Sequence, residues 1–441
     1  MSSNYPPVLP GLPLLGNALE FRRDPQALFQ RGYDKYGPIF TIKLGRKPAV
    51  VLVGPENGRF FFEQTDKSLS MREVYKFLIP MFGEDIFFAS GPDTYREQRN
   101  IMLPAFAGKK MPGYVRVMVR ETENWLDSLG DQGRFDLVST FEKLTMYIAA
   151  GAFLGEDFRQ RLGDEFALLY RQLGEGIEYL LPTNLPIPRF KRRDRAKAQL
   201  EKMIGKIIAE RLANPGSYED FLQSFLDATY SDGSKPPERV ITSLVLGMVF
   251  AGHETTAGHA SWGLVQLLQH PDYLEGVIAE IDENLPEGSE IDLDLTRNLE
   301  KLEWALKETE RMRPVAGLLM RYNAEDYELG GYHVPQGWLT VYAIGLSHRL
   351  DEIYTLPDVY DPNRFGPERQ EHRAHPNSLA GFGGGRHKCL GMNFAYVEMT
   401  VIFSLLLQRY HLELVDPMPT ADPTANTSRP RRPCWVSYKP R

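Results

Sequence analysis

The stretch that decides the fold is Phe382-Gly383-Gly384-Gly385-Arg386-His387-Lys388-Cys389-Leu390-Gly391. Three consecutive glycines favour neither helix nor strand, so the segment is predicted to be a tight loop whose backbone amides approach a bound group. From Met392 to Leu407 apolar residues recur at helical spacing, which predicts that a helix begins just after the loop. Cys389 therefore lies at or near a helix N-terminus, a position that favours a thiolate.

A lone cysteine is ordinarily a buried, inert thiol, and Cys389 without its neighbours would be interpreted in that way. Its neighbours favour a metal ligand instead. An aromatic ring, a glycine cradle and two cations suit a sulfur that accepts backbone hydrogen bonds beside a large anionic cofactor. The pattern F-G-x-G-x-[HR]-x-C-x-G resembles the haem-binding loop of the cytochrome P450 monooxygenases, and every fixed position is filled.

This resemblance implies a cytochrome P450 fold, a mainly α-helical triangular prism with a long central helix and a small β-rich lobe. It implies heme b (iron protoporphyrin IX) as the cofactor and the Cys389 thiolate as the iron ligand. The whole chain, 1–441, is expected to form one such domain, with its β-rich lobe near 37–55 and 315–345. The loop residues implied to contact the haem are Phe382, Gly383, His387 and Gly391.

Composition indicates a large packed core. The chain has 441 residues, of which 42% are hydrophobic and 25% charged, and its net charge of −7 does not indicate a nucleic-acid-binding protein. Its two cysteines exclude a disulfide framework and suit a reducing compartment, so we interpret the second, Cys434, as structural. The longest uncharged apolar run, Val240 to Phe250, is shorter than the roughly 20 residues of a membrane span. We therefore expect a cytoplasmic monomer without a membrane span, unless an N-terminal anchor has been removed.

Local patterns predict the order of elements. A helix is expected over 25–36, and a hairpin of two short strands over 39–44 and 49–53. Residues 114–227 are expected to be largely helical, with an interruption at 181–188 that is rich in proline. Further strands are expected near 327–341 and at the C-terminus.

Residues 242–269 are nearly all apolar and are predicted to form a helix buried through the middle of the protein. Its centre is Ala251-Gly252-His253-Glu254-Thr255-Thr256, where polar groups cost free energy unless they are paired or hydrated. One interpretation is structural, with hydroxyls bonded to the preceding turn. The other rests on resemblance to the family's [AG]-G-x-[DE]-T helix. It implies that Thr255 supports bound dioxygen, that Glu254 relays protons, and that Ala251 and Gly252 leave room for dioxygen.

Glu308 and Arg311 lie three residues apart on one face of a predicted helix, a spacing that usually gives a solvated pair of little consequence. In the family such an E-x-x-R pair is buried and joined by a downstream arginine. The resemblance implies that Arg364 is this third member and that the trio is structural, holding the cysteine loop.

Haem propionates need cations. The positions that resemble the family's propionate contacts are Arg99, Arg321 and His387, although each could singly be a solvated surface group. Tyr95 lies one turn before Arg99, where its hydroxyl could reach a propionate.

The segment from Tyr75 to Ala89 is rich in aromatic residues, most of which would ordinarily belong to a core. It resembles the signature Y-x-x-F-x-x-P-x-F-G-x-x-V-x-F of the sterol 14α-demethylases, with a one-residue offset and Ile86 in the valine position. Residues 158–170 and 185–194 resemble the substrate roof of the same enzymes. The residues expected to form the walls of a site for a bulky apolar substrate are Tyr75, Phe77, Phe82, Phe88, Phe250, Leu318 and Leu319.

One position departs from that branch. Sterol demethylases usually carry histidine followed by Thr-Ser where this chain has Glu254 followed by Thr255-Thr256. An acid is what hydroxylases generally use there, so hydroxylation of a fatty acid, terpenoid or retinoid stays open beside demethylation of a sterol. A haem-thiolate isomerase would not need this pair, and a haem sensor would need neither the pair nor a pocket. The resemblance to a haem domain takes up the whole chain, so no fused reductase domain is expected, and the resemblance implies a separate ferredoxin and ferredoxin reductase as electron donors.

Overall fold

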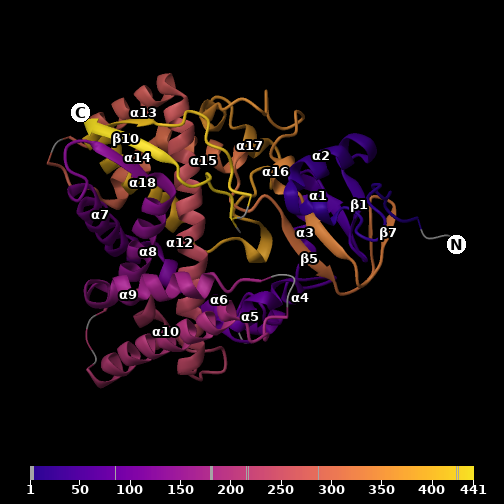
Figure 1. Cartoon of the computed structure of the whole chain (residues 1–441), viewed down its shortest axis with the longest axis horizontal. Helices are drawn as coiled ribbons and strands as arrows, with labels where there is room; N and C mark the ends of the chain where they lie inside the picture. Colours follow the sequence, from indigo (N-terminus) through magenta and orange to yellow (C-terminus); the bar gives the residue numbers. More distant parts are fainter. Residues whose placement is uncertain are drawn as a thin grey trace.

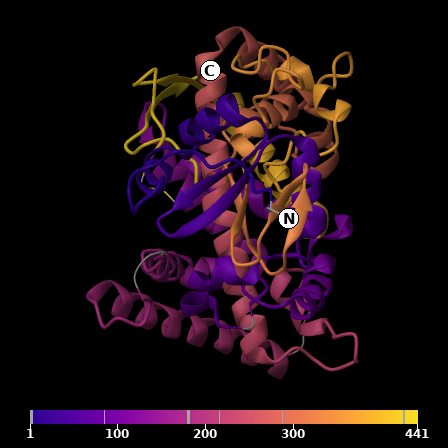
Figure 2. The ribbon, with the colours of Figure 1, turned by 90° about the vertical axis from the view of Figure 1, so that its right-hand side faces the viewer.

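We describe the chain from a computed structural model, which covers residues 4–84, 86–178, 182–214, 216, 218–286, 288–423, 425 and 427–441. The helix α12 (Glu238–Gln269) runs through the middle of the protein, with the other helices around it and a β-rich lobe on one side (Figures 1 and 2). Half of its 32 residues are Ala, Val, Leu or Gly, and most of the 32 are buried. A helix that is apolar on every side is stable only when it is surrounded by protein, which explains its central place.

Helices make up most of the described chain. The prediction over 25–36 is confirmed by α2, and the central helix begins four residues before the predicted Thr242. The α-helices are α1 (Ala18–Arg23), α2 (Pro25–Tyr36), α3 (Pro55–Gln64), α4 (Arg72–Tyr75), α5 (Ile79–Phe82), α6 (Pro92–Met102), α7 (Met111–Asp127), α8 (Leu137–Leu154), α9 (Glu156–Gly174), α10 (Pro188–Ala213), α11 (Phe221–Asp227), α12, α13 (Pro271–Asn284), α14 (Leu293–Asn298), α15 (Glu300–Met312), α16 (Ile344–Ser347), α17 (Glu371–Ala374) and α18 (Met392–Arg409).

The β-rich lobe is built on a five-stranded sheet in the order β1-β2-β8-β5-β3. The predicted hairpin is confirmed, with Ile39 opposite Leu52 in an antiparallel pair, and β2 continues into a parallel pair with β8. Two smaller sheets have the orders β4-β10-β9 and β6-β7. The strands are β1 (Ile39–Leu44), β2 (Lys47–Leu52), β3 (Leu69–Ser70), β4 (Gly133–Asp136), β5 (Leu319–Asn323), β6 (Tyr327–Leu329), β7 (Tyr332–Val334), β8 (Leu339–Tyr342), β9 (Tyr410–Leu414) and β10 (Trp435–Pro440).

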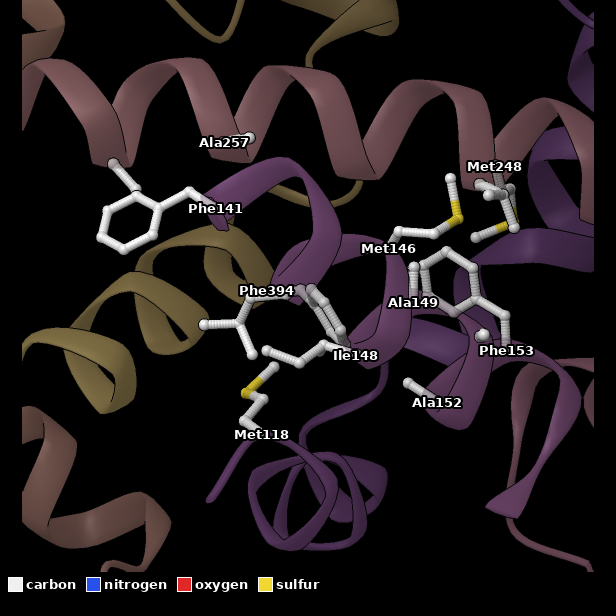
Figure 3. Packing of buried hydrophobic residues seen from close by; sticks show 14 of the residues in the cluster. Met118, Phe141, Met146, Ile148, Ala149, Ala152, Phe153, Met248, Ala257 and Phe394 are labelled. Carbon is white, nitrogen blue, oxygen red and sulfur yellow. The ribbon is translucent and has the colours of Figure 1, made fainter. Parts of the chain in front are cut away.

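The main core lies where α8, α12 and α18 meet. Figure 3 shows Phe141, Met146 and Phe153 of α8 in the same cluster as Met248 of α12 and Phe394 of α18. The rings of Phe153 and Phe394 have centroids 5.8 Å apart. Phe141 and Phe153 are at most 3% exposed. Burying aromatic rings of this size contributes about 1.5–3 kcal/mol each, so this junction fixes α18, and with it the loop that precedes α18, relative to α12.

One strand interrupts the region that the sequence predicts to be helical. Within 114–227, residues Gly133–Asp136 form β4 because they pair with β10, which lies about 300 residues away along the chain. Such a pairing is not visible in local periodicity. The described part of the predicted interruption, residues 182–187, is not helical, whereas Leu181 lies outside the described residues.

Two helices of the described chain are long and apolar enough to cross a membrane by length and composition, α8 and α12. Of the 18-residue windows that meet this test, 72% is buried in α8 and 67% in α12. Both helices belong to the packed core of this structure.

Candidate functional site

The cysteine loop is shaped by its glycines. Gly383 and Gly385 have φ angles of 72° and 59°, in the left-handed region that favours glycine. A Cβ on Gly384 would lie 2.5 Å from a ring atom of Phe62, so the backbone approaches α3 more closely than any side chain allows. The loop closes where the Cys389 amide donates to the Phe382 carbonyl at 2.9 Å. This closure fixes the direction in which the cysteine side chain leaves the loop.

The Cys389 sulfur lies just before α18, whose N-cap is Gly391. The thiol is exposed, yet protein surrounds it closely enough that burial raises its pKa, while amide hydrogen bonds from Gly391 and Met392 and the charge of Arg99 lower it. The helix start thus favours the thiolate, as predicted, but burial outweighs it. A bound cation at the sulfur would be needed to hold the thiolate at neutral pH.

The centre of α12 presents a small opening in an otherwise buried helix. Ala251 is exposed although it lies in the middle of the helix, and Glu254 and Thr255 are half-buried, whereas Thr256 is buried. The Thr255 hydroxyl donates to the Ala251 carbonyl, and the Thr256 hydroxyl donates to that of Gly252 at 2.7 Å. Both hydroxyls therefore bond to the preceding turn, as the structural interpretation expects. Exposure distinguishes them, because only Thr255 reaches the opening.

Glu254 lies near a buried tyrosine of α9. Burial raises the pKa of Tyr170 well above its usual value, and the charge of Glu254 raises it further. The Tyr170 hydroxyl donates its proton to the Leu246 carbonyl at 2.5 Å rather than to the Glu254 carboxylate. Contacts within the protein do not require glycine at position 252, since an added Cβ would lie 3.7 Å from the Phe153 ring, an ordinary contact distance.

Three of the predicted haem contacts gather at the cysteine loop. The Tyr95 ring stacks on the His387 ring, with centroids 4.0 Å apart, and the Tyr95 hydroxyl donates to the Arg386 carbonyl at 3.2 Å. Arg99 Nη1 donates to the Tyr95 hydroxyl and to the Lys388 carbonyl, each at 3.3 Å. The helix α6 thereby places a tyrosine and a cation beside the loop.

Arg321 approaches the same region from β5. Its side chain is 2% exposed, and burial lowers its pKa although Tyr75 and Asp66 oppose the shift. The Arg321 Nε donates to the Thr65 hydroxyl at 3.3 Å. A buried guanidinium whose pKa is lowered in this way would be stabilised by an anion placed against it.

Asp66 is a site residue that the sequence did not reveal. His387 Nε2 lies 2.7 Å from Asp66 Oδ2, and both side chains are almost completely buried. His387 Nδ1 is buried and has no hydrogen-bond partner among the described residues. This orphaned nitrogen, together with the buried Arg321, fits a cofactor that carries carboxylates at this edge.

The predicted ion-pair trio is brought together in the interior. Arg311 Nε lies 2.7 Å from Glu308 Oε2, and Arg364 Nε lies 3.1 Å from Glu308 Oε1, with no exposed side-chain surface on any of the three. The Arg311 Nη1 also donates to the carbonyls of His348 and Pro357. The usual interpretation of an i,i+3 pair as solvated therefore does not apply here.

Among the described residues, the side chains of the trio make no hydrogen bond to the cysteine loop, but two neighbouring side chains bond to the two residues just before it. His348 Nε2 accepts from the Ala380 amide at 2.8 Å, and Glu310 Oε1 accepts from the Gly381 amide at 2.9 Å. Neither residue was predicted. A lone histidine and a helix glutamate give no sequence signal, because their partners lie 32 and 71 residues away.

The aromatic segment is described except for Asp85, which lies outside the described residues. Tyr75 stacks with Phe77 and with Phe88, at centroid distances of 6.0 and 6.4 Å. Phe82 is 1% exposed and packs against Phe250 at 5.3 Å, so it lies behind Phe250 rather than at a surface. The half-buried residues of the predicted substrate wall are Tyr75, Phe77, Phe88, Phe250, Leu318 and Leu319.

Among the described residues, no group of three or more His, Cys, Asp or Glu side chains could hold a metal ion. The chemistry of a thiolate allows Cys389 to supply one protein ligand to an iron whose other ligands come from a porphyrin. The residues around it, with their cations and their orphaned nitrogen, fit that group.

Comparisons with known proteins agree with this geometry. The sequence model of the family described as Cytochrome P450 matches residues 6–435. The obtusifoliol 14-alpha demethylase of Sorghum bicolor is 34% identical over 99% of this chain and 90% of its own length. The sterol 14alpha-demethylase of Mycolicibacterium vanbaalenii is 32% identical over 97% and 96%. The solved structure of retinoic acid bound cyanobacterial CYP120A1 has a TM-score of 0.89 and 26% identity, with all of both chains covered. This likeness confirms the predicted fold.

Proposed function

This chain belongs to the cytochrome P450 family and is a haem-dependent monooxygenase, and from that premise we propose that Cys389 is the iron ligand of a heme b. The observation that carries the proposal is the closed loop that directs the Cys389 sulfur, with the amides of Gly391 and Met392 as donors to it. Sulfur ligands of this kind depend on such amide bonds. Phe382, Gly383 and Gly391 would contact the haem as parts of the same loop.

The propionates of the haem would be held by Arg99, Arg321, His387 and Tyr95. Support comes from the burial of Arg321, which lowers its pKa, and from the buried Nδ1 of His387, which has no hydrogen-bond partner among the described residues. A carboxylate would stabilise the first and bond to the second. Asp66 would then fix the other nitrogen of the same imidazole. Glu308, Arg311 and Arg364 would brace the loop indirectly. Arg311 binds the His348 carbonyl, and the His348 side chain binds the Ala380 amide just before the loop.

When bound, the haem supplies the iron at which dioxygen is activated. The part left to this chain is to hold the reacting partners and to move protons. The Thr255 hydroxyl stands at the opening beside Ala251, and by turning away from the Ala251 carbonyl it could donate its single proton to dioxygen in that opening. The half-buried Glu254 can exchange protons between solvent and that hydroxyl, while the apolar remainder of α12 excludes bulk water.

The substrate is proposed to be a bulky apolar molecule of the sterol class, oxidised in the manner of a sterol 14-demethylase. Support comes from the identity of 32–34% with such enzymes along almost the whole chain and from the aromatic cluster of Tyr75, Phe77 and Phe88. A second candidate is the hydroxylation of a terpenoid, retinoid or fatty acid. The carboxylate of Glu254 favours it, because this acid stands where sterol demethylases usually carry histidine.

The substrate class is tested by titrating the haem-loaded protein with a lanosterol-like sterol, retinoic acid and a long-chain fatty acid while the iron spin state is recorded. A sterol-induced shift from low to high spin is expected. A shift with retinoic acid or the fatty acid, and none with any sterol, would replace the sterol proposal with the second candidate.

Electrons are proposed to come from a separate ferredoxin with its reductase, since P450 enzymes depend on redox partners. The exposed cations Arg386 and Lys388 lie three residues and one residue before Cys389 and would attract an acidic partner. The rate of reduction by a ferredoxin should fall as ionic strength rises. At low salt the Lys388→Glu variant should be reduced more slowly than the wild type. We further propose that residues 1–441 act as one domain in a cytoplasmic monomer.

A further inference from the structure

Glu310 of α15 is a buried carboxylate that the proposed mechanism does not use. It is 5% exposed. Its Oε1 accepts a hydrogen bond from the Gly381 amide at 2.9 Å, and its Oε2 accepts one from the Tyr396 hydroxyl at 2.6 Å. Each carboxylate oxygen therefore has one donor, and the two donors come from different parts of the chain.

These two donors lie at opposite ends of the cysteine loop. Gly381 directly precedes Phe382, whose carbonyl accepts from the Cys389 amide, and Tyr396 lies in the second turn of α18. The contact at Gly381 is close, since an added Cβ would lie 2.5 Å from Glu310 Cγ. The Phe382 ring lies 5.5 Å from the Tyr396 ring. One side chain thus joins the start of the loop to the helix that follows it.

The charge of Glu310 also reaches the sulfur. Burial is the largest cause of the raised pKa of Cys389, and Glu310 is the anion that raises it further. Burial raises the pKa of Glu310 itself to about 7, although Tyr396, the Gly381 amide, Lys388 and Lys307 all lower it. Lys307 is already paired with Glu303 at 2.5 Å.

The remaining titratable groups around this carboxylate do not replace its role. His348 binds the Ala380 amide, and Tyr354 lies close enough for the charge of Glu310 to raise its pKa. His259 of α12 faces Tyr396 with its ring 6.1 Å away, but burial lowers its pKa to about 4 and keeps it neutral. Lys388 is exposed on the loop and is therefore screened by solvent. Burial thus brings the pKa of Glu310 to about 7, so this carboxylate changes its charge near neutral pH.

We propose that Glu310 is a positioning residue that clamps both ends of the cysteine loop and whose charge adjusts the electron density at the Cys389 thiolate. This rests on the proposed iron ligation by Cys389. When Glu310 takes up a proton, Oε1 keeps the bond from Gly381, while the new hydroxyl at Oε2 donates to Tyr396, whose own hydroxyl turns to become the acceptor. The clamp survives, and the negative charge behind the sulfur is lost. A more electron-rich thiolate lowers the reduction potential of its iron.

The test measures the reduction potential of the haem-loaded protein between pH 6 and pH 8 in four variants. Glu310→Gln keeps the shape and removes the charge. Tyr396→Phe removes one donor, Glu310→Ala removes the clamp, and Glu300→Gln, an exposed glutamate of the same helix, is the control. In the wild type and the control the potential should fall as pH rises through about 7, because Glu310 ionises. In Glu310→Gln it should be more positive at pH 8 and should lose this step.

Tyr396→Phe should move the midpoint of the step to higher pH, because the carboxylate loses a donor that lowers its pKa. Glu310→Ala should lose part of the thiolate-type Soret band of the reduced, carbon monoxide-bound form. If Glu310→Gln has the potential and the pH step of the wild type, or if Tyr396→Phe leaves the midpoint in place, the inference is wrong. If the wild type itself has no thiolate-type band, the proposed function has failed rather than this inference.

Discussion

The Arg311 guanidinium meets the Glu308 carboxylate at two points, with Nε 2.7 Å from Oε2 and Nη2 2.8 Å from Oε1, and neither side chain has exposed surface. A bidentate pair of this kind is strong and directional, and it is costly to leave half-made. Arg364 shares Oε1 of the same carboxylate. The three residues form one unit that fixes α15 against the segment around Pro357 and Asp361.

Replacement of Arg311 by lysine should therefore destabilise the protein. Lysine cannot make the two-point contact or reach the carbonyls of His348 and Pro357, and it leaves the Glu308 charge only partly compensated. We expect a loss of about 3–5 kcal/mol in the free energy of unfolding, measured by urea denaturation. Arg297→Lys, in an exposed pair of the same i,i+3 spacing with Asp294, is the control and should change little. Equal effects of the two substitutions would contradict the assignment.

Replacement of Cys389 by serine should abolish the red-shifted, thiolate-type Soret band of the reduced, carbon monoxide-bound protein. The physical reason is that the band requires an iron-bound thiolate, which serine cannot supply. Cys434→Ala is the control, because Cys434 is 3% exposed and packs in the core. Retention of the band in Cys389→Ser, or its loss only in the Cys434 variant, would show that another residue binds the iron.

Thr255 and its neighbour Thr256 make a matched pair on α12. Both hydroxyls bond back to the preceding turn, yet Thr255 stands at the opening beside Ala251 and Thr256 is buried. Thr255→Ala should divert reducing equivalents into hydrogen peroxide, while Thr256→Ala should mainly affect stability. Glu254→Gln should lower kcat by about 100-fold if proton delivery limits the reaction. Oxygen consumption, peroxide and product are measured together, and unchanged coupling in Thr255→Ala would remove its proposed role.

His348 should make the protein less stable in mild acid. Burial, with a further contribution from Arg311, lowers the pKa of His348 to about 3. The unfolded chain takes up a proton below about pH 6.5 and the folded protein does not, so stability is complete above 6.5 and is lost as the pH falls toward 3. At pH 5 the loss from this residue is about 2 kcal/mol.

The measurement compares urea denaturation at pH 7 and pH 5 in the wild type and in His348→Gln, whose side-chain oxygen can still accept from the Ala380 amide. The raised pKa of Glu310 acts in the opposite direction, since the folded protein gains that proton first as the pH falls from 7 toward 4.5. Both proteins contain Glu310, so its effect cancels in the comparison. An identical pH dependence in both would show that His348 does not titrate as the structure indicates.

Phe250 and Phe82 should respond differently to truncation, although their rings are 5.3 Å apart. Phe82 is 1% exposed, so Phe82→Ala should cost about 3–5 kcal/mol of stability through loss of packing. Phe250 is half-buried on α12, and Phe250→Ala should mainly raise the Kd of the apolar substrate in a spin-state titration. If Phe82→Ala raised the substrate Kd and Phe250→Ala mainly lowered the free energy of unfolding, the two assignments would be wrong.

Much of the candidate site could be predicted because its motifs are local. The loop from Phe382 to Gly391 and the polar centre of α12 each lie within ten residues, so their residue types can be recognised together. Asp66, His348 and Glu310 could not be recognised. Asp66 meets His387 across 321 residues, and nothing near it in the sequence marks a buried carboxylate.

The sequence by itself determined the elements whose physical causes are local. Glycine conformations shape the cysteine loop, apolar periodicity produces α12 and α18, and the turn between 44 and 47 produces the first hairpin. Tertiary structure decided which charges are buried and what they face. A glutamate three residues from an arginine is a solvated pair on an exposed helix and a rigid brace in the interior, because the strength of the interaction depends on the water that surrounding chains exclude.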